Sequence, residues 1–439
     1  MRYLFVHQNF PGQFLHIVRH LLAQGGHDIV FITQPNPNHI NGVRKVTYQL
    51  ARPINPDTHA DAQDFELAMR RADAVAQTAA KLRALGFSPD IIIGHHGWGE
   101  LLNLADVWPG VPMLGYHEFY YHTEGVDVGF DPEFPLDRAT FARVRAKNAV
   151  NLLALTNPGH GQSPTRWQLS TYPDWARPGI NLLPEGVNLA TCRPDPSLRE
   201  RPMLVGTINV KPSEKLVTYV ARDLEPYRGF HIMMRALPAI LRARRDVRVI
   251  LVGGDGVSYG ARLASGSWRD YMMGQVGSEI DLSRVHFPGK IDYNDYLRML
   301  QRSDAHVYLT YPFVASWSLR EALACGCAIV ASDTEPVHEF VTHGRTGMLV
   351  PFLKPHALAE QVLEVLEDAG LGFRLRAAAR RHAEAALSLD ENLAAYERLI
   401  GRLIGASCET AAPELAEDGQ LAEDGPIVIS APRRRSRAG

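Results

Sequence analysis

The sequence predicts an α/β protein of two doubly wound domains, each a parallel sheet covered by helices on both faces. Short apolar runs of strand length alternate with helical patterns along most of the chain. The alternation is interrupted by the Pro-rich, charged stretch Pro194–Pro202 and then restarts. The length of 439 residues fits two or three domains, and 46% hydrophobic with 21% charged residues is typical of a globular chain.

The first half begins with a β-α-β unit. Leu4–Val6 is predicted as a strand, apolar residues recur at helical spacing from Phe14 to Leu22, and Asp28–Thr33 is predicted as a second strand. A helix is expected from about residue 61 to 85, where Ala, Leu and Val recur at helical spacing. Further strands are predicted at the apolar runs Ile91–Ile93, Met113–Tyr116 and Leu152–Leu155.

The second half repeats this alternation. Strands are predicted at 216–221, 247–252, 307–309 and 328–331, and helices at 230–241, 296–300 and 319–324. With the hinge near residue 200, we expect an N-terminal domain over 1–198 and a C-terminal domain over 199–388. An amphipathic helix over 389–405 is expected to pack back toward the first domain, and residues 406–439, rich in Glu, Asp, Ala, Gly and Pro, to form a disordered tail.

Charge and cysteine content exclude several classes of protein. A formal charge of −2 gives no global field for binding nucleic acid. The four cysteines are too few and too scattered for a disulfide framework or a four-ligand zinc site, so we read Cys325-Gly-Cys327 as small buried residues and expect a cytoplasmic protein. No apolar stretch is long enough to span a membrane. The terminal Arg433–Arg437 leaves peripheral contact with the inner face of a membrane open.

The turn after the strand at 216–221 carries the first candidate site, because open α/β sheets bind ligands at the carboxyl ends of their strands. Arg222 and Arg228 place two guanidinium groups there, which suits a diphosphate. The alternative is that they pair with Asp223 and Glu225 on a solvated loop, and spacing alone leaves both interpretations open.

Two further strand ends in the second half are candidates. The first is the Gly-rich turn after the strand at 247–252. Such a turn lets the backbone approach a ligand closely, although most Gly-rich turns bind nothing. A carboxylate one turn into the helix after residue 318 can accept two ribose hydroxyls, or it can simply stabilise the helix dipole. The expected donor-binding residues are Gly253, Gly254, Asp255, Ser316, Trp317, Ser318, Leu319 and Glu321.

The first half supplies candidates for the acceptor side of the cleft. Each follows a predicted strand: Gly12 and Gln13 after the first, His95 and His96 after the third, His117 and Glu118 after the fourth. Paired histidines also suggest a metal, but no third ligand is evident, so we expect none.

Taken together, these motifs resemble family 4 of the retaining glycosyltransferases over about residues 1–400. The resemblance rests on Arg222-x5-Arg228-Gly229, the Gly253–Gly256 turn and Ser318-x2-Glu321-Ala322, with Pro184–Asn188 similar to the family's segment near the domain junction. It implies a GT-B fold, in which two Rossmann-like domains face each other across a cleft and the C-terminal one holds a nucleotide sugar without a required metal.

Carried over to this sequence, the resemblance implies that Arg222 and Arg228 hold the diphosphate and Glu321 the ribose. It also implies that His117 contacts the donor sugar or positions the reacting groups. The expected function is transfer of a sugar from a nucleoside diphosphate sugar to a hydroxyl acceptor, a glycan or lipid-linked glycan, in polysaccharide or glycoconjugate synthesis. The alternative is a noncatalytic nucleotide-sugar binder. A dehydrogenase is disfavoured because no strand-linked G-x-G-x-x-G with an acidic partner occurs.

Two departures from the family pattern stand out. The family's paired glutamates lie eight positions apart, whereas eight positions before Glu321 this chain has Phe313. The family's second cation lies five residues after the arginine, whereas here that position is Tyr227 and Arg228 comes one later. We therefore expect the loop from Val314 to contact the sugar through backbone N–H groups or serine hydroxyls.

Overall fold

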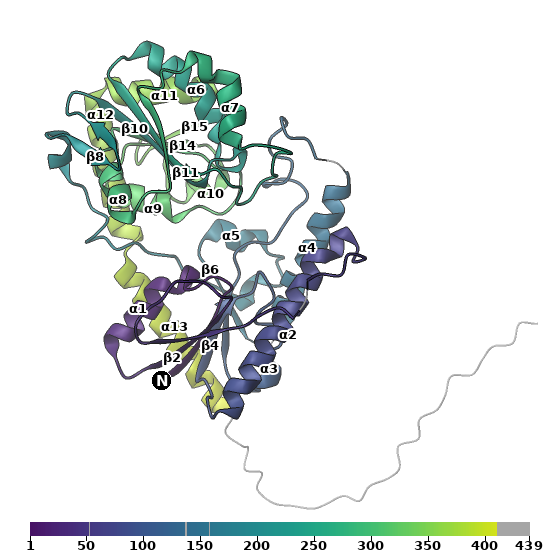
Figure 1. Cartoon of the computed structure of the whole chain (residues 1–439). Coiled ribbons are helices and arrows are strands. Elements are labelled where there is room, and N and C mark those ends of the chain that lie inside the picture. Colours follow the sequence, from purple (N-terminus) through teal and green to yellow (C-terminus); the bar gives the residue numbers. More distant parts are fainter. Residues whose placement is uncertain (52, 137, 158, 411–439) are drawn as a thin grey trace, which may run out of the picture.

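The computed structural model describes residues 1–410 apart from positions 52, 137 and 158, and for residues 138 and 406–410 it describes the backbone alone. The chain folds into two stacked domains, each built on a parallel sheet (Figure 1). This confirms the predicted class. Of the described helices, none combines the length and apolar composition needed to cross a bilayer.

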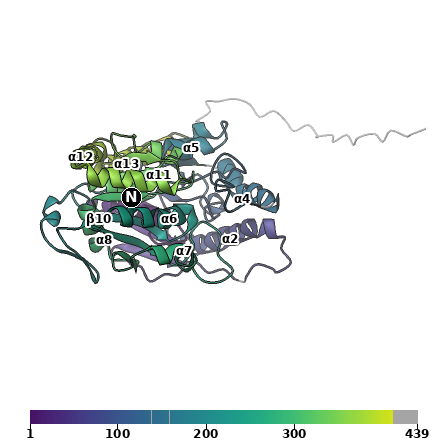
Figure 2. The same cartoon turned by 90° about the horizontal axis from the view of Figure 1, so that it is seen from above.

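The N-terminal sheet has seven parallel strands in the order β3-β2-β1-β4-β5-β6-β7. The strands are β3 (Val43–Thr47), β2 (Asp28–Thr33), β1 (Arg2–Val6), β4 (Ile91–His95), β5 (Met113–Tyr116), β6 (His160–Ser163) and β7 (Ile180–Leu182). The helices of this domain are α1 (Leu15–Gln24), α2 (Gln63–Ala84), α3 (Leu104–Val107), α4 (Arg138–Thr156) and α5 (Arg166–Thr171). Seen from above, α2 and α4 lie to one side of the C-terminal domain (Figure 2).

The C-terminal sheet has six parallel strands in the order β12-β11-β10-β13-β14-β15. They are β12 (Val285–Gly289), β11 (Val247–Gly254), β10 (Lys215–Asp223), β13 (Ala305–Tyr308), β14 (Ile329–Ser332) and β15 (Met348–Val350), and β8 (Met203–Val205) and β9 (Ile208–Val210) form an antiparallel pair. The helices are α6 (Phe230–Ala243), α7 (Trp268–Val276), α8 (Tyr293–Arg302), α9 (Trp317–Ala324), α10 (Glu335–His338), α11 (Pro355–Glu367) and α12 (Ala369–Ala386).

Alternating side chains of the strands enter separate cores on the two faces of each sheet. In β10, Val217 and Tyr219 pack with α6, α7 and α11, while Leu216 packs with α8, α9 and α12. In β1, Tyr3 and Phe5 pack with α1, while Leu4 and Val6 pack with α2 and α3. Burial on both faces explains why these strands are continuous apolar runs in the sequence.

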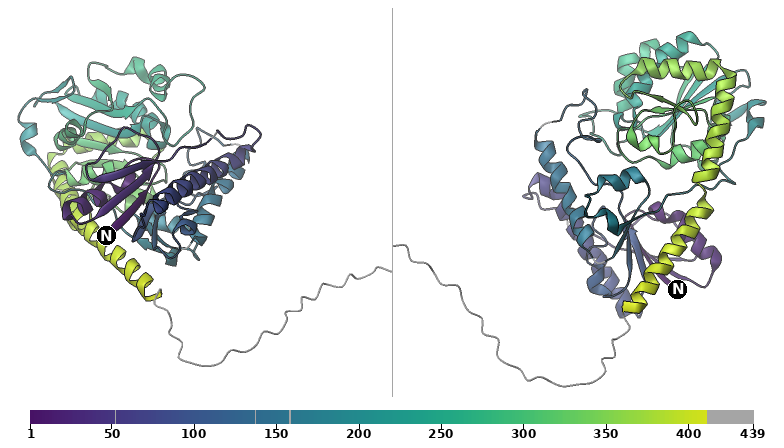
Figure 3. Two further views of the ribbon diagram at one scale, coloured as in Figure 1. Left: turned by 60° about the horizontal axis from the view of Figure 1, so that its bottom comes forward. Right: turned by 180° about the vertical axis from the view of Figure 1, so that it is seen from behind.

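The chain crosses between the two cores twice, at adjacent points. Leu183 packs with the N-terminal sheet, whereas Val187 packs with the C-terminal one, so the first crossing lies before the Pro-rich stretch at 194–202. The second crossing is α13 (Leu389–Thr410), which runs along the N-terminal domain (Figure 3). The two are hydrogen-bonded to each other: Val187 N donates to Leu387 O at 2.9 Å, and Leu389 N to Val187 O at 3.1 Å.

Two element predictions are corrected. The apolar run Leu152–Leu155 is not a strand but the last part of α4. The strands that follow β5 are β6 and β7, which the sequence reading missed, as it missed the edge strand β3. Helix α13 continues to Thr410, past the predicted end at residue 405, and the remainder of the predicted tail, 411–439, lies outside the described residues.

Candidate functional site

The carboxyl ends of both sheets meet at the junction between the domains. Phe119, just after β5, contacts Phe313, just after β13, with ring centroids 5.0 Å apart. Trp167 Nε1 of α5 donates to Glu335 Oε2 at 2.9 Å, and the Trp167 backbone N–H donates to Glu339. The strand-end loops predicted to carry the chemistry therefore face one another.

Two histidines in edge-on contact, His7 and His95, line the N-terminal side of this junction. His95 stacks on Trp98 with ring centroids 4.1 Å apart, and the His7 ring meets the His95 ring edge-on at 5.4 Å. His95 Nδ1 accepts the backbone N–H of Gly97 at 2.9 Å, and His7 Nδ1 accepts that of Asn9 at 2.8 Å. Each ring, when neutral, therefore carries its proton on Nε2.

Glu118 lies beside this pair. Its Oε2 is 3.6 Å from His95 Nε2, and its side chain is 29% exposed, whereas that of His95 is 1% exposed. Burial opposes ionisation of Glu118, but His95, His7 and Arg222 together outweigh it and lower the pKa of the carboxyl below its usual value. Glu118 is therefore an ionised carboxylate at neutral pH.

His96 and His117 form a second pair, which is directed into the domain. Their ring centroids are 4.8 Å apart, and His117 meets Tyr172 edge-on at 5.3 Å. Burial lowers the pKa of both, that of His117 to about 3. The structure thus places His117, at 3% exposed, behind the edge that His95 and Glu118 form.

Gly12 and Gln13 lie close to the same edge. At Gly12, with φ of 55°, a Cβ would sit 2.7 Å from the His7 ring, so only glycine fits. Gln13 lines a small cavity of about 30 Å³ at the junction, together with Trp317 of the C-terminal domain. Both residues are therefore near the junction, and Gly12 serves the close approach of its loop to His7.

Arg222 and Arg228 take different positions on the C-terminal side. Arg222 is exposed, with its guanidinium carbon 5.6 Å from the Tyr259 ring centroid. Arg228 is buried, donates from Nη1 to Thr310 Oγ1 at 2.8 Å and to Val314 O at 3.0 Å, and lies 4.8 Å from the Tyr259 ring. Both cations are thus held against the same aromatic ring.

The predicted alternative, in which these arginines pair with Asp223 and Glu225, is wrong. Asp223 instead accepts from Ser258 Oγ and lies 3.9 Å from Lys290 Nζ, and Glu225 accepts backbone N–H groups of residues 258–260. Among the residues that the structure describes, no carboxylate forms an ion pair with Arg222 or Arg228. Two uncompensated cations at one strand end favour an anionic ligand.

The strand that carries Arg222 has a bulge near its end. The pairing of β10 with β11 shifts register between Val220 and Asp223. The strand then ends in a single 3-10 turn, Pro226–Arg228, before α6. Arg222 thus lies in a bulge at the end of the strand, and Arg228 in the turn that follows it.

The Gly-rich turn after β11 packs against the turn after β10. A Cβ at Gly253 would lie 2.8 Å from the Leu224 side chain, and one at Gly254 would lie 2.6 Å from the Asp223 carboxylate. Asp255 forms an ion pair with Arg269 at 2.7 Å. These contacts give the two glycines a packing role and direct Asp255 toward α7.

The side chains at the start of α9 are engaged in contacts at the interdomain junction. Ser316 Oγ and Ser318 Oγ lie 2.6 Å apart, and Trp317 Nε1 donates to Glu185 Oε2 at 2.8 Å. Leu319 is fully buried in the core under α9. Glu185 also accepts from Tyr116 Oη at 3.0 Å, so it joins the N-terminal sheet to α9.

Glu321 is held by two tyrosines of α8. Tyr293 Oη donates to its Oε1 and Tyr296 Oη to its Oε2, each at 2.7 Å. Burial raises the pKa of the Glu321 carboxyl, and the tyrosine hydrogen bonds partly offset this. The tyrosines leave further lone pairs on both oxygens, so the carboxylate can still accept hydroxyl groups.

Phe313 lies in an aromatic cluster that spans the two domains. Its ring centroid is 5.3 Å from that of Tyr227 and 5.2 Å from that of Tyr259, and Arg228 lies 6.0 Å from its face. The wall of the junction at this loop is therefore aromatic, and no carboxylate projects from position 313.

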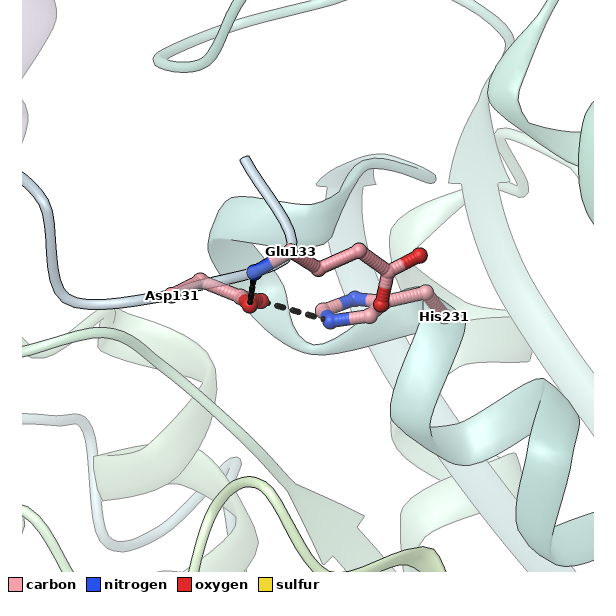
Figure 4. A group of neighbouring side chains, drawn as sticks. All are labelled: Asp131, Glu133 and His231. Carbon is pink, nitrogen blue, oxygen red and sulfur yellow. Dashed lines mark hydrogen bonds and ion pairs between the residues drawn. The ribbon is translucent and has the colours of Figure 1, made fainter. Parts of the chain in front are cut away.

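A second interdomain contact lies between β5 and α4, where the chain segment rises beside the C-terminal domain (Figure 1). Asp131 Oδ2 accepts from His231 Nε2 at 2.8 Å and from Tyr311 Oη at 3.0 Å, and Glu133 lies beside them (Figure 4). One ligand atom from each of Asp131, Glu133 and His231 falls within 4.8 Å of the others, which is metal-like spacing. However, Glu133 is also paired with Arg235 at 2.6 Å, and a cation there disfavours a metal ion.

Sequence reasoning missed several residues that the structure brings to the junction. His7 had a usable signal, since it directly follows the first strand. Glu185 lies in the segment Pro184–Asn188, whose similarity to the family's junction segment was a usable signal. Asp131 had none, because it owes its place to partners distant in the chain. The predicted residues that lie at the junction are His95, Glu118, Gln13, Arg222, Arg228 and Trp317. Glu321 lies one turn further along α9, against α8.

Comparisons with known families and proteins agree with this geometry. A family model described as glycosyl transferase family 4 group matches residues 25–192, and one described as glycosyl transferases group 1 matches residues 207–384. The phosphatidyl-myo-inositol mannosyltransferase of Mycolicibacterium smegmatis is 30% identical over 209 residues, 46% of this chain and 47% of that protein. The glycogen synthase of Mycobacterium tuberculosis is 24% identical over 414 residues, 87% of this chain and 90% of that protein.

Solved structures share the arrangement of both domains. The sucrose-phosphate synthase of Thermosynechococcus elongatus superposes with a TM-score of 0.68 at 20% identity, covering 92% of this chain and all of that one. Anabaena HepE, in complex with UDP and glucose, superposes with a TM-score of 0.64 at 18% identity and the same coverage. The chain thus spans about half the length of the mannosyltransferase and nearly all of the other proteins.

Proposed function

Because this chain belongs to family 4, group 1, of the glycosyltransferases and has their GT-B fold, we propose that its donor is a nucleoside diphosphate sugar. It transfers the sugar to a hydroxyl group of a glycan or lipid-linked glycan, with retention at the anomeric carbon, in the synthesis of a bacterial polysaccharide or glycoconjugate. The observation that carries the proposal is the pair Arg222 and Arg228, two cations at the carboxyl end of β10 that form no ion pair with a carboxylate of the described residues.

In the proposed reaction, the bond between the anomeric carbon and the phosphate oxygen breaks, and its electron pair stays on the departing nucleoside diphosphate. The acceptor oxygen bonds to the anomeric carbon on the same face, and its proton passes to a departing phosphate oxygen. Arg222 and Arg228 stabilise the negative charge on the diphosphate, which grows in the transition state. Glu321 accepts the ribose hydroxyls, and no metal ion is needed.

The structure supports a division of work between the arginines. Arg228 uses Nη1 to hold the loop after β13, so its charge is in place before the ligand binds. Arg222 is exposed and free to move its donors onto phosphate oxygens. A preorganised charge beside a mobile one suits a ligand whose charge increases during the reaction.

Nucleotide release from a panel of UDP-, GDP- and ADP-sugars, each with and without glycan acceptors, tests the function. UDP comes first because Anabaena HepE was solved with it. A ligand at 100 times its Kd raises stability by about 2.7 kcal/mol, so a thermal-shift screen identifies the nucleotide before turnover is measured. Because Phe313 stands where the family has a glutamate, the alternative function is a noncatalytic nucleotide-sugar binder. Binding without turnover across the panel would establish that alternative.

Arg222→Ala is the sharpest single variant. We expect kcat/KM to fall by a factor equivalent to about 3 kcal/mol, because a charge that stabilises the departing diphosphate is lost. Arg242→Ala is the matched control, since Arg242 is an exposed arginine of α6 paired only with Glu279. Equal kcat/KM for both variants and the parent protein would remove Arg222 from the mechanism.

A further inference from the structure

Glu118 is a carboxylate at the junction whose two side-chain oxygens are both unengaged by the described residues. Its side-chain oxygens have, among the described residues, no hydrogen-bond donor within normal distance, because His95 Nε2 is 3.6 Å away. Its backbone is held in place, since Gln168 Nε2 donates to the Glu118 carbonyl at 2.8 Å. The carboxylate is thus positioned by its own backbone and by neighbouring rings, with its lone pairs left for a ligand.

Neighbouring carboxylates each have at least one oxygen engaged. Each accepts a hydrogen bond from a tyrosine or serine hydroxyl, a tryptophan indole or a backbone N–H group, and the second oxygen of Asp127 is buried without a partner among the described residues. These residues are Asp127, Glu185, Asp223, Glu225, Glu321 and Glu339. Of these, Glu321 is the carboxylate assigned to the ribose in the proposed site.

The position of Glu118 places it opposite the diphosphate-binding cations. Its neighbour Phe119 contacts Phe313, whose ring in turn lies under Arg228. Arg222 contributes to the low pKa of Glu118, which requires the two groups to lie within electrostatic range across the junction. A sugar attached to a diphosphate held by Arg222 and Arg228 would therefore lie against Glu118.

We propose that Glu118 is a catalytic residue, which contacts the transferred sugar and stabilises the positive charge on its anomeric carbon and ring oxygen in the transition state. The inference rests on the proposed function and assigns Glu118 to the donor sugar rather than to the acceptor. Glu118 forms no bond to the sugar and gains no proton: the electron pair leaves with the diphosphate, and the acceptor proton follows it. Position 313 of the C-terminal domain carries a phenylalanine, where the family has a glutamate. In this protein the carboxylate beside the sugar therefore comes from Glu118 of the N-terminal domain.

The test uses the full-length protein and the nucleotide sugar that it turns over fastest in the panel. We expect Glu118→Gln to lower kcat about 100-fold, because a charge matched to the transition state is lost while shape is kept. The Kd for UDP should not change, since the diphosphate site is intact. Hydrolysis of the donor without acceptor should fall by the same factor, which an acceptor-binding role would not cause.

Two further variants keep the test decisive. Glu118→Asp keeps the charge but withdraws it by one methylene, so its kcat should fall between those of the parent protein and Glu118→Gln. Glu124→Gln, an exposed carboxylate of the same segment, is the matched control and should leave kcat unchanged. Parent-like kcat in Glu118→Gln, or a rise in acceptor KM alone, would overturn the inference while leaving the proposed function standing. If the parent protein itself turns over no donor, the proposed function fails instead.

Discussion

His7, His96 and His117, which are buried at the carboxyl edge of the N-terminal sheet, are neutral at pH 7, because burial lowers the pKa of each. Desolvation is the largest cause, and it lowers the pKa of His7 and of His117 to about 3 each. At His7 the neighbouring His95 contributes in the same direction. These three histidines therefore add no positive charge to that of Arg222 and Arg228, and their rings present N–H groups and aromatic faces instead.

This burial makes the protein sensitive to mild acid. An unfolded histidine, with its pKa near 6.5, gains a proton between pH 7 and 5, whereas folded His117 does not until pH approaches about 3. Stability is therefore fully present above pH 6.5 and falls as pH drops toward 3. At pH 5 we expect a loss of about 2 kcal/mol for His117 and a similar loss for His7.

Urea unfolding at several pH values between 5 and 7 measures this loss. In His117→Asn, the dependence of unfolding free energy on pH should be shallower by about 1 kcal/mol per pH unit below pH 6, whatever the variant's stability at pH 7. His39→Asn is the control, because His39 is exposed. Identical slopes in the parent protein and His117→Asn would contradict the burial argument.

At the scale of single residues, position at the end of a strand predicted which residues lie at the junction. It did not predict which groups those residues bind. Arg222, Arg228, His95 and Glu118 were predicted because each follows a strand, and parallel strands end at one edge. That neither arginine pairs with a carboxylate of the described residues was not predictable, since Glu225 instead accepts backbone N–H groups that lie more than 30 residues away in sequence. The acidic residues next to the arginines in the sequence, Asp223 and Glu225, were therefore the wrong ion-pair partners to expect.

Among the elements, the loop after β11 depends on one carboxylate. Glu225 is fully buried, and it accepts N–H groups from Ser258, Tyr259 and Gly260 at 3.1, 3.1 and 2.9 Å. Burial raises its pKa, and the three N–H groups partly offset this. Because Tyr259 is the ring against which Arg222 and Arg228 lie, Glu225 links the loop to the proposed diphosphate site.

Glu225→Ala should therefore loosen this loop. Three N–H groups lose their acceptor, and we expect a loss of about 2 kcal/mol in unfolding free energy together with faster hydrogen exchange at residues 258–260. Glu225→Gln keeps one acceptor oxygen and should lose less. Glu214→Ala is a useful comparison, since Glu214 pairs with Arg248 far from the loop. Unchanged exchange at 258–260 in Glu225→Ala would show that the loop is held by other contacts.

Elements with strong apolar patterns were predictable, and those defined by distant partners were not. Strand β5 was predicted to the residue because Met113–Tyr116 is buried throughout. Strand β6, His160–Ser163, is polar, and its Gln162 side chain donates to Tyr396 of α13. The apolar run Leu152–Leu155 was misread because periodicity cannot separate a short buried strand from a helix segment.

At the scale of the whole molecule, the domains are joined at two ends of their interface. One is the double crossing near Val187 and Leu389, with Glu185 bound to both Tyr116 and Trp317. The other is the segment before α4, whose Phe130 and Phe134 pack on the C-terminal core. Closure of two domains around a ligand excludes water and completes a site, so the second contact bears on catalysis.

Asp131 holds this second contact, and its removal should open the domains. Burial alone would raise its pKa, but hydrogen bonds from His231, the Glu133 backbone and Tyr311 outweigh it and the pKa is lowered, so the carboxylate is charged. In Asp131→Ala the buried His231 and Tyr311 donors lose their acceptor, which should cost the closed arrangement about 2–3 kcal/mol. Small-angle scattering should then give a larger radius of gyration, and kcat/KM for the donor should fall.

Glu133→Ala separates this effect from a general loss of charge in the segment. Glu133 and Arg235 form a partly exposed pair, with side chains 34% and 27% exposed, and such pairs contribute about 0–1 kcal/mol. Its radius of gyration and kcat/KM should stay close to those of the parent protein. If Glu133→Ala opens the domains as much as Asp131→Ala does, the segment is held by its summed charge. If neither variant opens them, the packing of Phe130 and Phe134 is sufficient, because apolar burial does not depend on the charge of its neighbours.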